Sequence, residues 1–294
     1  MKRKQIKEYI VFGVVALIAA IAIIMTRQIG TEKIYPTEEN DKLQILFLGD
    51  SNFAYDFGDR TIPDRIGERL NADIYNCAIG GTAATRTDTT YYFDSDLDAF
   101  NLYNLSKIMV SGDYQGVNAY AGRGGEFGKT AVLKAEIITN IDLDELDYIV
   151  IGYGLNDYTS GCAVYGEDPY DETTYIGALR GSVERIRTVC PNAKIILSSI
   201  TYCIFYGNDI ALQDGYGKTY GGGYINDYRD AMETVAAEYE NVYFIDNLEK
   251  LDINKDNFMD YLHDEMHLNY AGQEMYVDSF IEELEKIESE FNEQ

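Results

Sequence analysis

Two segments far apart in the chain carry the residue types of an activated serine nucleophile. The apolar run at 43–48 stops at Gly49-Asp50-Ser51, which would expose the serine at the tip of a buried strand. Near the other end of the sequence, Asp264 stands three residues before His267. A histidine can accept the serine proton while a carboxylate orients the imidazole, so this pairing predicts nucleophilic attack on an acyl carbonyl.

The elements that must position these residues alternate between apolar runs and helical patterns. We expect buried strands at 43–48, 73–79, 148–153, 194–201 and 242–246. Two helices show apolar residues at steps of three or four, namely Ile176, Leu179, Val183, Ile186 and Val189 in one, and Val277, Phe280, Ile281, Leu284, Ile287 and Phe291 in the other. Strands that alternate with helices predict a parallel sheet covered on both faces, with its chemistry at the carboxyl ends of the strands.

Hydrogen-bond donors follow the second and third of these strands. Gly80 and Gly81 come after the strand that contains Asn76, and glycines there let backbone N–H groups face a substrate. Asn156 follows the third strand, where its side-chain amide can donate a hydrogen bond to an oxyanion.

These four segments, in this order, resemble the SGNH/GDSL hydrolase family. Its blocks are Gly-Asp-Ser, a glycine after the second strand, Gly-x-Asn-Asp, and Asp-x-x-His, and the resemblance runs from residue 43 to about residue 290. It implies an α/β fold, a three-layer α/β/α sandwich with a five-stranded parallel sheet, which is the flavodoxin-like SGNH hydrolase fold. The chain departs from the family's name at Asn52, where the family has leucine, but that position carries no chemistry.

The family likeness implies a role for each residue of the predicted triad. Ser51 is the nucleophile, His267 is the general base and acid, and Asp264 fixes the histidine tautomer. Asp260 and His263 also fit the Asp-x-x-His spacing and form the alternative pair. We choose His267 because the residues that follow it continue the family pattern.

The likeness also implies an oxyanion hole. Its donors would be the backbone N–H of Ser51, the backbone N–H of Gly81 and the side-chain amide of Asn156. Gly80 is the alternative to its neighbour Gly81.

The N-terminus predicts a membrane signal. Four basic residues, Lys2, Arg3, Lys4 and Lys7, precede a charge-free run from Tyr9 to Met25. At about 1.5 Å per residue, this run would reach roughly 26 Å, the short end of the range for a membrane-spanning helix. The basic residues before the run predict an N-terminus inside the cell and a catalytic domain outside.

We therefore predict four segments: a cytoplasmic basic tail at 1–8, a transmembrane signal anchor at 9–26, a linker at 27–41 and an SGNH hydrolase-type esterase domain at 42–294. This organisation predicts a single-pass protein of the cell membrane with an extracytoplasmic domain. A protein secreted after signal cleavage is the alternative, because Ala20-Ile21-Ala22 has small residues at the required spacing.

Charge excludes one class of partner. The 24 basic and 50 acidic residues give a formal net charge of -26, and such a surface repels polyanions. Nucleic acid is therefore not an expected partner.

The cysteines suggest a crosslink but no metal site. Cys77 and Cys190 are expected to be buried, whereas Cys162 and Cys203 follow two strands expected to be neighbours and could form a disulfide in an oxidising compartment. The sequence has no Cys-x-x-Cys pair, which argues against zinc ribbons and dithiol redox chemistry.

No cofactor or metal is expected. Gly128-Lys129-Thr130 ends like a phosphate-binding loop, but Arg123 stands where that loop needs its first glycine. The stretch from Asp252 to Asp256 begins like a calcium loop, but Asn257 replaces the required glycine.

The sequence thus predicts a membrane-anchored extracytoplasmic serine esterase that hydrolyses short-chain acyl esters, O-acetyl groups above all, on small molecules or on cell-wall or capsular glycans. The chain has 26 tyrosines and no tryptophan, and tyrosine suits sugar rings because it combines an apolar face with a hydroxyl. The tyrosines that follow strand ends are Tyr91, Tyr92, Tyr158, Tyr202, Tyr206, Tyr220 and Tyr224. The alternatives are a glycan O-acyltransferase with the same triad and a catalytically silent glycan-binding module.

Overall fold

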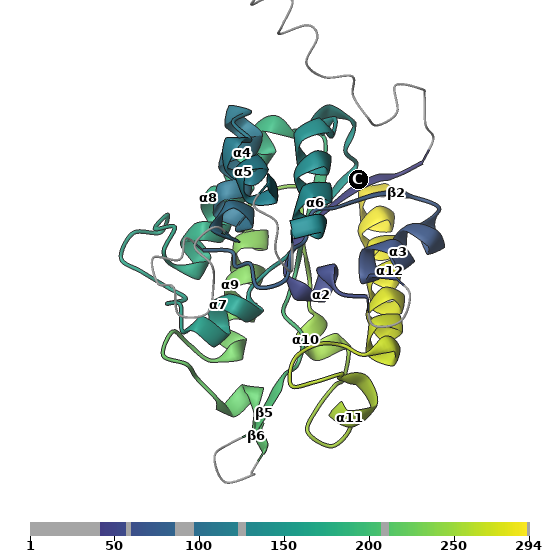
Figure 1. Cartoon of the computed structure of the whole chain (residues 1–294). Helices are drawn as coiled ribbons and strands as arrows, with labels where there is room; N and C mark the ends of the chain where they lie inside the picture. The colour runs from purple at the N-terminus through teal and green to yellow at the C-terminus, as the bar shows by residue number, and fades with distance from the viewer. Residues whose placement is uncertain (1–41, 57–59, 86–96, 123–127, 207–211, 293–294) are drawn as a thin grey trace, which may run out of the picture. The chain divides into compact units, whose positions relative to one another are not determined.

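The computed structural model describes residues 42–56, 60–85, 97–122, 128–206 and 212–292 (Figure 1). The chain divides after Asn40, and all the described residues belong to the second unit, Asp41–Gln294. Its helices are α2 (Ser51–Ala54), α3 (Ile62–Leu70), α4 (Leu102–Ser111), α5 (Gln115–Gly122), α6 (Gly128–Asn140), α7 (Leu155–Ser160), α8 (Tyr175–Val189), α9 (Ile225–Ala237), α10 (Asn247–Lys250), α11 (Phe258–Tyr261) and α12 (Tyr270–Asn292).

The predicted five-stranded parallel sheet is confirmed. Its strands are β1 (Gln44–Gly49), β2 (Asp73–Asn76), β3 (Tyr148–Gly152), β4 (Lys194–Ser198) and β7 (Val242–Ile245). They lie in the order β2-β1-β3-β4-β7, and every neighbouring pair is parallel. The chain segments that leave β1, β2 and β3 therefore emerge side by side at one edge of the sheet, where ligands bind in folds of this kind.

Amphipathic helices cover the sheet. Helices α3 and α12 pack together, and α8 packs between α4 and α9. Figure 1 shows the first pair on one side of the sheet and the other three on the opposite side. The predicted apolar stripes face inward, because Leu179, Val183, Phe280 and Leu284 are all buried.

The predicted fold needs one correction, which concerns the N-terminal transmembrane helix. Within the described ranges, no helix is long and apolar enough to cross a membrane. The longest, α12, has 23 residues but carries acidic side chains throughout its exposed face. The predicted anchor at 9–26, the tail at 1–8 and the linker at 27–41 all lie outside the described residues, and the fold that the structure describes is the α/β domain.

An additional antiparallel hairpin, which the sequence did not predict, lies beyond β4. It consists of β5 (Ile204–Tyr206) and β6 (Leu212–Asp214). The disulfide between Cys162 and Cys203 that the sequence left open is not formed, because both cysteines are free thiols. The hairpin keeps Cys203 against Gly215, whose N–H donates to the Cys203 carbonyl over 3.0 Å, while the Cys162 thiol lies 3.3 Å from the Thr173 carbonyl.

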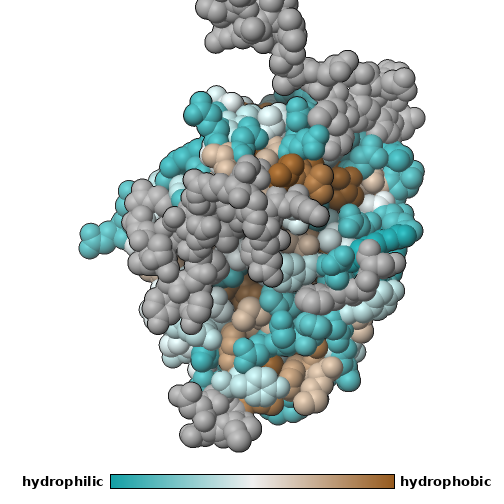
Figure 2. All heavy atoms as spheres, viewed as in Figure 1, coloured by the Kyte–Doolittle hydropathy of each residue, from teal (hydrophilic) through white to brown (hydrophobic). Residues whose placement is uncertain are grey.

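Apolar side chains also reach the surface in places. Figure 2 shows a hydrophobic patch over α6, where Val132 and Leu133 are exposed. Several of the exposed large hydrophobic residues elsewhere in the described chain are tyrosines, whose hydroxyl group keeps them compatible with water.

A buried carboxylate joins α7 to the chain that follows β2. Asp157 is fully buried and accepts hydrogen bonds from the Ala84 N–H (2.9 Å), the Thr85 N–H (3.1 Å) and the Thr85 hydroxyl (2.7 Å). Burial raises the pKa of Asp157, although these hydrogen bonds act in the opposite direction. The carboxylate therefore replaces water for backbone groups that no strand or helix satisfies.

Removing this acceptor should destabilise the domain. In Asp157→Ala the donors on Ala84 and Thr85 stay buried without a partner, so we expect a loss of about 3 kcal/mol in the free energy of unfolding. Urea unfolding followed by circular dichroism measures it. Asp144→Ala, at an exposed aspartate, is the control, and equal stability of the two variants would contradict the assigned role.

Candidate active site

Ser51 is the first residue of α2 and follows β1 after a single residue. Asp50 caps the helix, because its carboxylate accepts a hydrogen bond from the Asn52 N–H over 3.0 Å. Phe53 then turns back over the sheet. A Cβ at Gly49 would lie 2.6 Å from its ring, and one at Gly152 would lie 2.4 Å from it, so the glycines that end β1 and β3 make room for the helix that carries the serine.

The structure brings Ser51, His267 and Asp264 together. Nε2 of His267 lies 2.8 Å from the Ser51 hydroxyl, and Nδ1 lies 2.7 Å from Oδ2 of Asp264. Ser51 is buried except for 5% of its surface. With Nδ1 protonated toward Asp264, Nε2 can accept the serine proton, which is the arrangement that activates a serine.

Backbone contacts hold the loop that carries the histidine. Leu262 and Leu268 form an antiparallel bridge at its base, and the His263 N–H donates to the His267 carbonyl over 2.8 Å. On one face of the loop, the ring of Tyr55 lies 5.2 Å from the imidazole, measured between centroids. The imidazole is thus positioned by both chain geometry and packing.

The carboxylate of the site stays ionised. Burial acts to raise the pKa of Asp264, but the hydrogen bonds from the His267 ring and from the N–H groups of Met266 and His267 outweigh it, so the net shift is downward. The two N–H groups donate to Oδ1 over 2.9 Å and 2.8 Å, which leaves Oδ2 for the imidazole. An anion in this place stabilises the imidazolium that forms when the serine loses its proton.

Candidate oxyanion donors lie on the segments that leave β1, β2 and β3. Within the described residues, no hydrogen bond occupies the backbone N–H of Ser51 or of Gly81. Gly81 has φ +84°, in the left-handed region that favours glycine. Gly80 is buried, and a Cβ there would lie 2.6 Å from the Tyr55 hydroxyl.

Asn156 closes this group of donors. It lies in the first turn of α7, and its amide donates one hydrogen bond to the Thr82 carbonyl over 2.8 Å. Thr82 in turn donates from its hydroxyl to the Gly49 carbonyl over 3.2 Å. These contacts tie the segments after β1, β2 and β3 together, and the amide keeps a second N–H.

In the alternative pair, His263 lies on the same loop and Asp260 lies in α11. His263 and Asp260 have exposed side chains, and the imidazole that faces Ser51 is that of His267. In the described part of the chain, no group of three or more His, Cys, Asp or Glu residues is arranged to hold a metal ion.

Asp50 is a second titratable carboxyl group near Ser51. The sequence singles it out only as part of Gly49-Asp50-Ser51 and assigns it no role. Asp50 is 2% exposed, and burial raises its pKa to about 7. The hydrogen bond from the Asn52 N–H acts to lower this pKa, whereas the negative charge of Asp157 acts to raise it further. It borders a cavity of about 20 Å³, together with Thr201 and Tyr276, which is too small for a substrate. A carboxylate directly after a fully buried strand is the only sequence signal for this behaviour.

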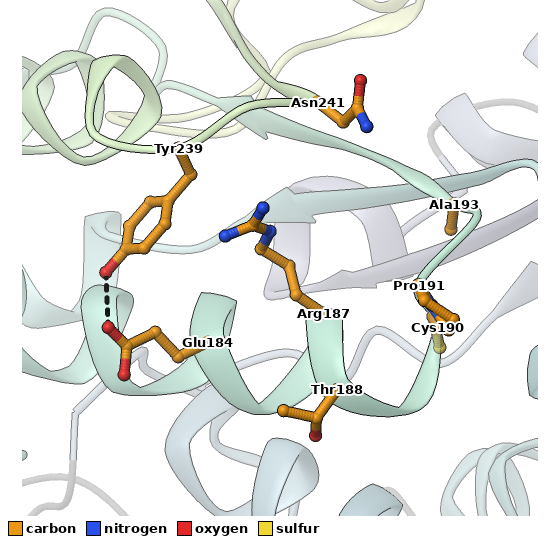
Figure 3. Close-up of a pocket in the computed structure, with 8 residues that line it drawn as sticks. All are labelled: Glu184, Arg187, Thr188, Cys190, Pro191, Ala193, Tyr239 and Asn241. Atoms are coloured by element: carbon orange, nitrogen blue, oxygen red, sulfur yellow. Dashed lines mark hydrogen bonds between the residues drawn. The ribbon is translucent and has the colours of Figure 1, made fainter.

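A larger hollow of about 540 Å³ lies at the opposite edge of the sheet (Figure 3). Ala193 and Asn241, which precede β4 and β7, line it, so it opens at the amino ends of the strands. Figure 3 shows the Tyr239 hydroxyl donating to Glu184 across it. It is therefore separate from the site around Ser51.

Comparison with known proteins identifies the family. A family model described as the GDSL-like Lipase/Acylhydrolase family matches residues 47–275. The chain belongs to this family. As a GDSL-like acylhydrolase it is a serine hydrolase that acts on ester bonds. No curated protein matches this GDSL-like chain at a significant level.

Solved structures share the fold of this GDSL-like protein. A protein from Lactobacillus plantarum is 17% identical with a TM-score of 0.56, and the match covers 83% of this chain and 97% of that one. A protein described as a possible lipase from Chitinophaga pinensis DSM 2588 is 16% identical with a TM-score of 0.54, covering 84% and 99%. A salicylyl-acyltransferase of a tetracycline biosynthetic pathway is 15% identical with a TM-score of 0.50, covering 85% and 56%. At these identities the likeness concerns the fold alone.

The raised pKa of Asp50 predicts a pH dependence of stability. Its pKa is 3.8 in an unfolded reference and about 7 in the folded domain, so the folded state holds the proton more tightly between these values. The free energy of unfolding should therefore fall as pH rises from about 4 to 7, by on the order of 4 kcal/mol from this group. Asp50→Asn keeps a helix-capping oxygen and should remove this part of the slope.

Urea unfolding of both proteins at pH 4.5 and pH 7.5 measures the difference. Asp144→Asn, at an exposed carboxylate, controls for the loss of one acidic group. If Asp50→Asn loses as much stability between the two pH values as the unmodified protein does, Asp50 does not titrate in this range.

Proposed function

We propose that this chain hydrolyses short-chain acyl esters, O-acetyl groups on glycans above all, by a Ser51–His267–Asp264 mechanism. The observation that carries the proposal is the continuous chain of hydrogen bonds, 2.8 Å from Ser51 to His267 and 2.7 Å from His267 to Asp264. Membership of a family of lipases and acylhydrolases supports the same chemistry.

In the first half of the reaction, the Ser51 oxygen attacks the carbonyl carbon of the acyl group. Its proton passes to Nε2 of His267, and the ionised Asp264 stabilises the resulting imidazolium. Negative charge develops on the former carbonyl oxygen, where the N–H groups of Ser51, Gly81 and the Asn156 amide stabilise it. The imidazolium then protonates the leaving alkoxide, and the alcohol departs from an acyl-serine.

In the second half, water replaces the alcohol. His267 takes a proton from the water molecule as the latter attacks the acyl-serine, and it returns that proton to the Ser51 oxygen when the carboxylic acid leaves. A sugar hydroxyl in the place of water would give acyl transfer, so the identity of the second acceptor decides between hydrolase and transferase.

Charge and surface chemistry support a neutral glycan ester as substrate. The net charge of -26 disfavours polyanionic substrates. Of the tyrosines expected to meet sugars, Tyr158 and Tyr202 are buried, Tyr206, Tyr220 and Tyr224 are exposed, and Tyr91 and Tyr92 lie outside the described residues. Export of the domain to cell-wall or capsular glycans stays a prediction from the basic residues and apolar run of the N-terminal sequence.

Substitution of the two histidines tests the triad. We expect His267→Ala and Ser51→Ala to lose hydrolysis of 4-nitrophenyl acetate by on the order of 10⁴–10⁶-fold, because the nucleophile then lacks its base or is missing. His263→Ala is the matched control, because His263 lies four positions away in the same loop and is exposed. Activity that survives His267→Ala but disappears in His263→Ala would assign the base to the other histidine.

Substitution of Asn156 tests the oxyanion hole. Asn156→Ala should lower kcat about 10²–10³-fold, since one preorganised donor typically contributes about 2.7–4 kcal/mol to the transition state. The matched control is Asn140→Ala, whose amide also donates to a backbone carbonyl, that of Glu136 over 2.8 Å. Equal kcat values for the two variants, measured with 4-nitrophenyl acetate, would remove Asn156 from the site.

A further inference from the structure

The β5–β6 hairpin is attached to the loop that carries the catalytic residues. The Ile204 N–H donates to the Glu265 carbonyl over 2.8 Å, and the Tyr206 N–H donates to Oε1 of Glu265 over 2.8 Å. Glu265 directly follows Asp264 and stands two residues before His267. Strand β5 therefore runs along the catalytic loop, and the hairpin extends from it at one end of the domain (Figure 1).

Two side chains near the tip of this hairpin face water. Tyr206 and Leu212 are directly opposite each other in the antiparallel register, so they share one face of the hairpin. Tyr206 is 62% exposed and Leu212 is 41% exposed. Ile204, on the same face and about 7 Å back along the strand, is buried. The base of the hairpin on this face is therefore covered, and the exposed pair lies just beyond it.

The opposite face of the hairpin holds the pair in place. Phe205 is buried, and its ring packs edge-on against Tyr220 with centroids 5.6 Å apart. Tyr220 packs in turn against Tyr158 of α7, 5.4 Å away, and Lys218 lies 4.6 Å from the Tyr220 ring centroid. Because α7 also carries Asn156, this bracing fixes the hairpin relative to the oxyanion donors.

We propose that Tyr206 and Leu212 form a platform on which a neutral pyranose ring of the acylated substrate stacks, while its ester enters the site at Ser51. This inference rests on the proposed function. A sugar ring has an apolar C–H face that matches an aromatic ring and hydroxyl groups that hydrogen-bond to polar neighbours.

Charge and exposure select the sugar over other occupants. Glu265 and Asp214 lie at the base of the platform, so an anionic sugar would be repelled there. A fatty acyl chain prefers an enclosed apolar pocket, whereas Tyr206 is largely open to water and presents a hydroxyl. Both features favour the neutral ring.

Kinetics with two kinds of ester test the platform. Acetylated xylotetraose carries the sugar, and 4-nitrophenyl acetate does not. For Tyr206→Ala we expect the ratio of kcat/KM on acetylated xylotetraose to kcat/KM on 4-nitrophenyl acetate to fall about tenfold, mainly through KM for the oligosaccharide. Tyr206→Phe keeps the ring and should stay within about threefold of the unmodified ratio. Tyr170→Ala, at an exposed tyrosine whose hydroxyl contacts Glu184, should leave the ratio unchanged.

Three results would overturn the platform. The first is an unchanged ratio in Tyr206→Ala. The second is an unmodified enzyme that hydrolyses 4-nitrophenyl acetate but not acetylated xylotetraose. The third is a loss in Tyr206→Ala that grows along a 4-nitrophenyl acetate-to-octanoate series, which would assign the pair to an acyl chain. Failure of the unmodified protein on every ester is a different outcome, because it would overturn the proposed function itself together with the platform.

Discussion

A 2.8 Å hydrogen bond between residues 216 positions apart, Ser51 and His267, is the contact on which the proposed chemistry of this domain depends. Both ends are held by separate means. Glycines beneath Phe53 fix the helix that begins with the serine, and the Leu262–Leu268 bridge closes the loop that presents the histidine. These contacts place the Ser51 hydroxyl and the His267 imidazole within hydrogen-bond reach, as the proposed reaction requires.

The pKa values of two carboxyl groups in this small region are shifted in opposite directions. Asp264 is kept ionised by donors from its own loop, whereas Asp50 is pushed toward the neutral form by burial. Asp264 contacts the imidazole of His267, so its negative charge lies where it would stabilise the imidazolium of the proposed mechanism. The neutral form of Asp50 adds no negative charge next to Ser51, its neighbour in the chain.

Much of the fold could be predicted from the sequence because the strands of the sheet are continuous apolar runs. Reasoning from apolar runs failed for features that depend on the three-dimensional arrangement of the chain. Ile204–Tyr206 is too short to stand out as a strand, and the free thiols of Cys162 and Cys203 follow from where that hairpin and the loop after α7 place them. The meeting of Ser51 with His267 followed from family-like motifs, but the burial of Asp50 and the contact between Glu265 and Tyr206 depend on packing that no local pattern encodes.

The carboxylate that orients the histidine is not sealed from solvent, because the Asp264 side chain is 44% exposed while that of His267 is only 16% exposed. Dissolved ions can therefore approach one end of the hydrogen-bonded chain and weaken its attraction for the imidazolium, whereas the serine end is shielded. The strength of this attraction is therefore partly a property of the medium around the domain, and an ion-rich surface would act on it differently from dilute buffer.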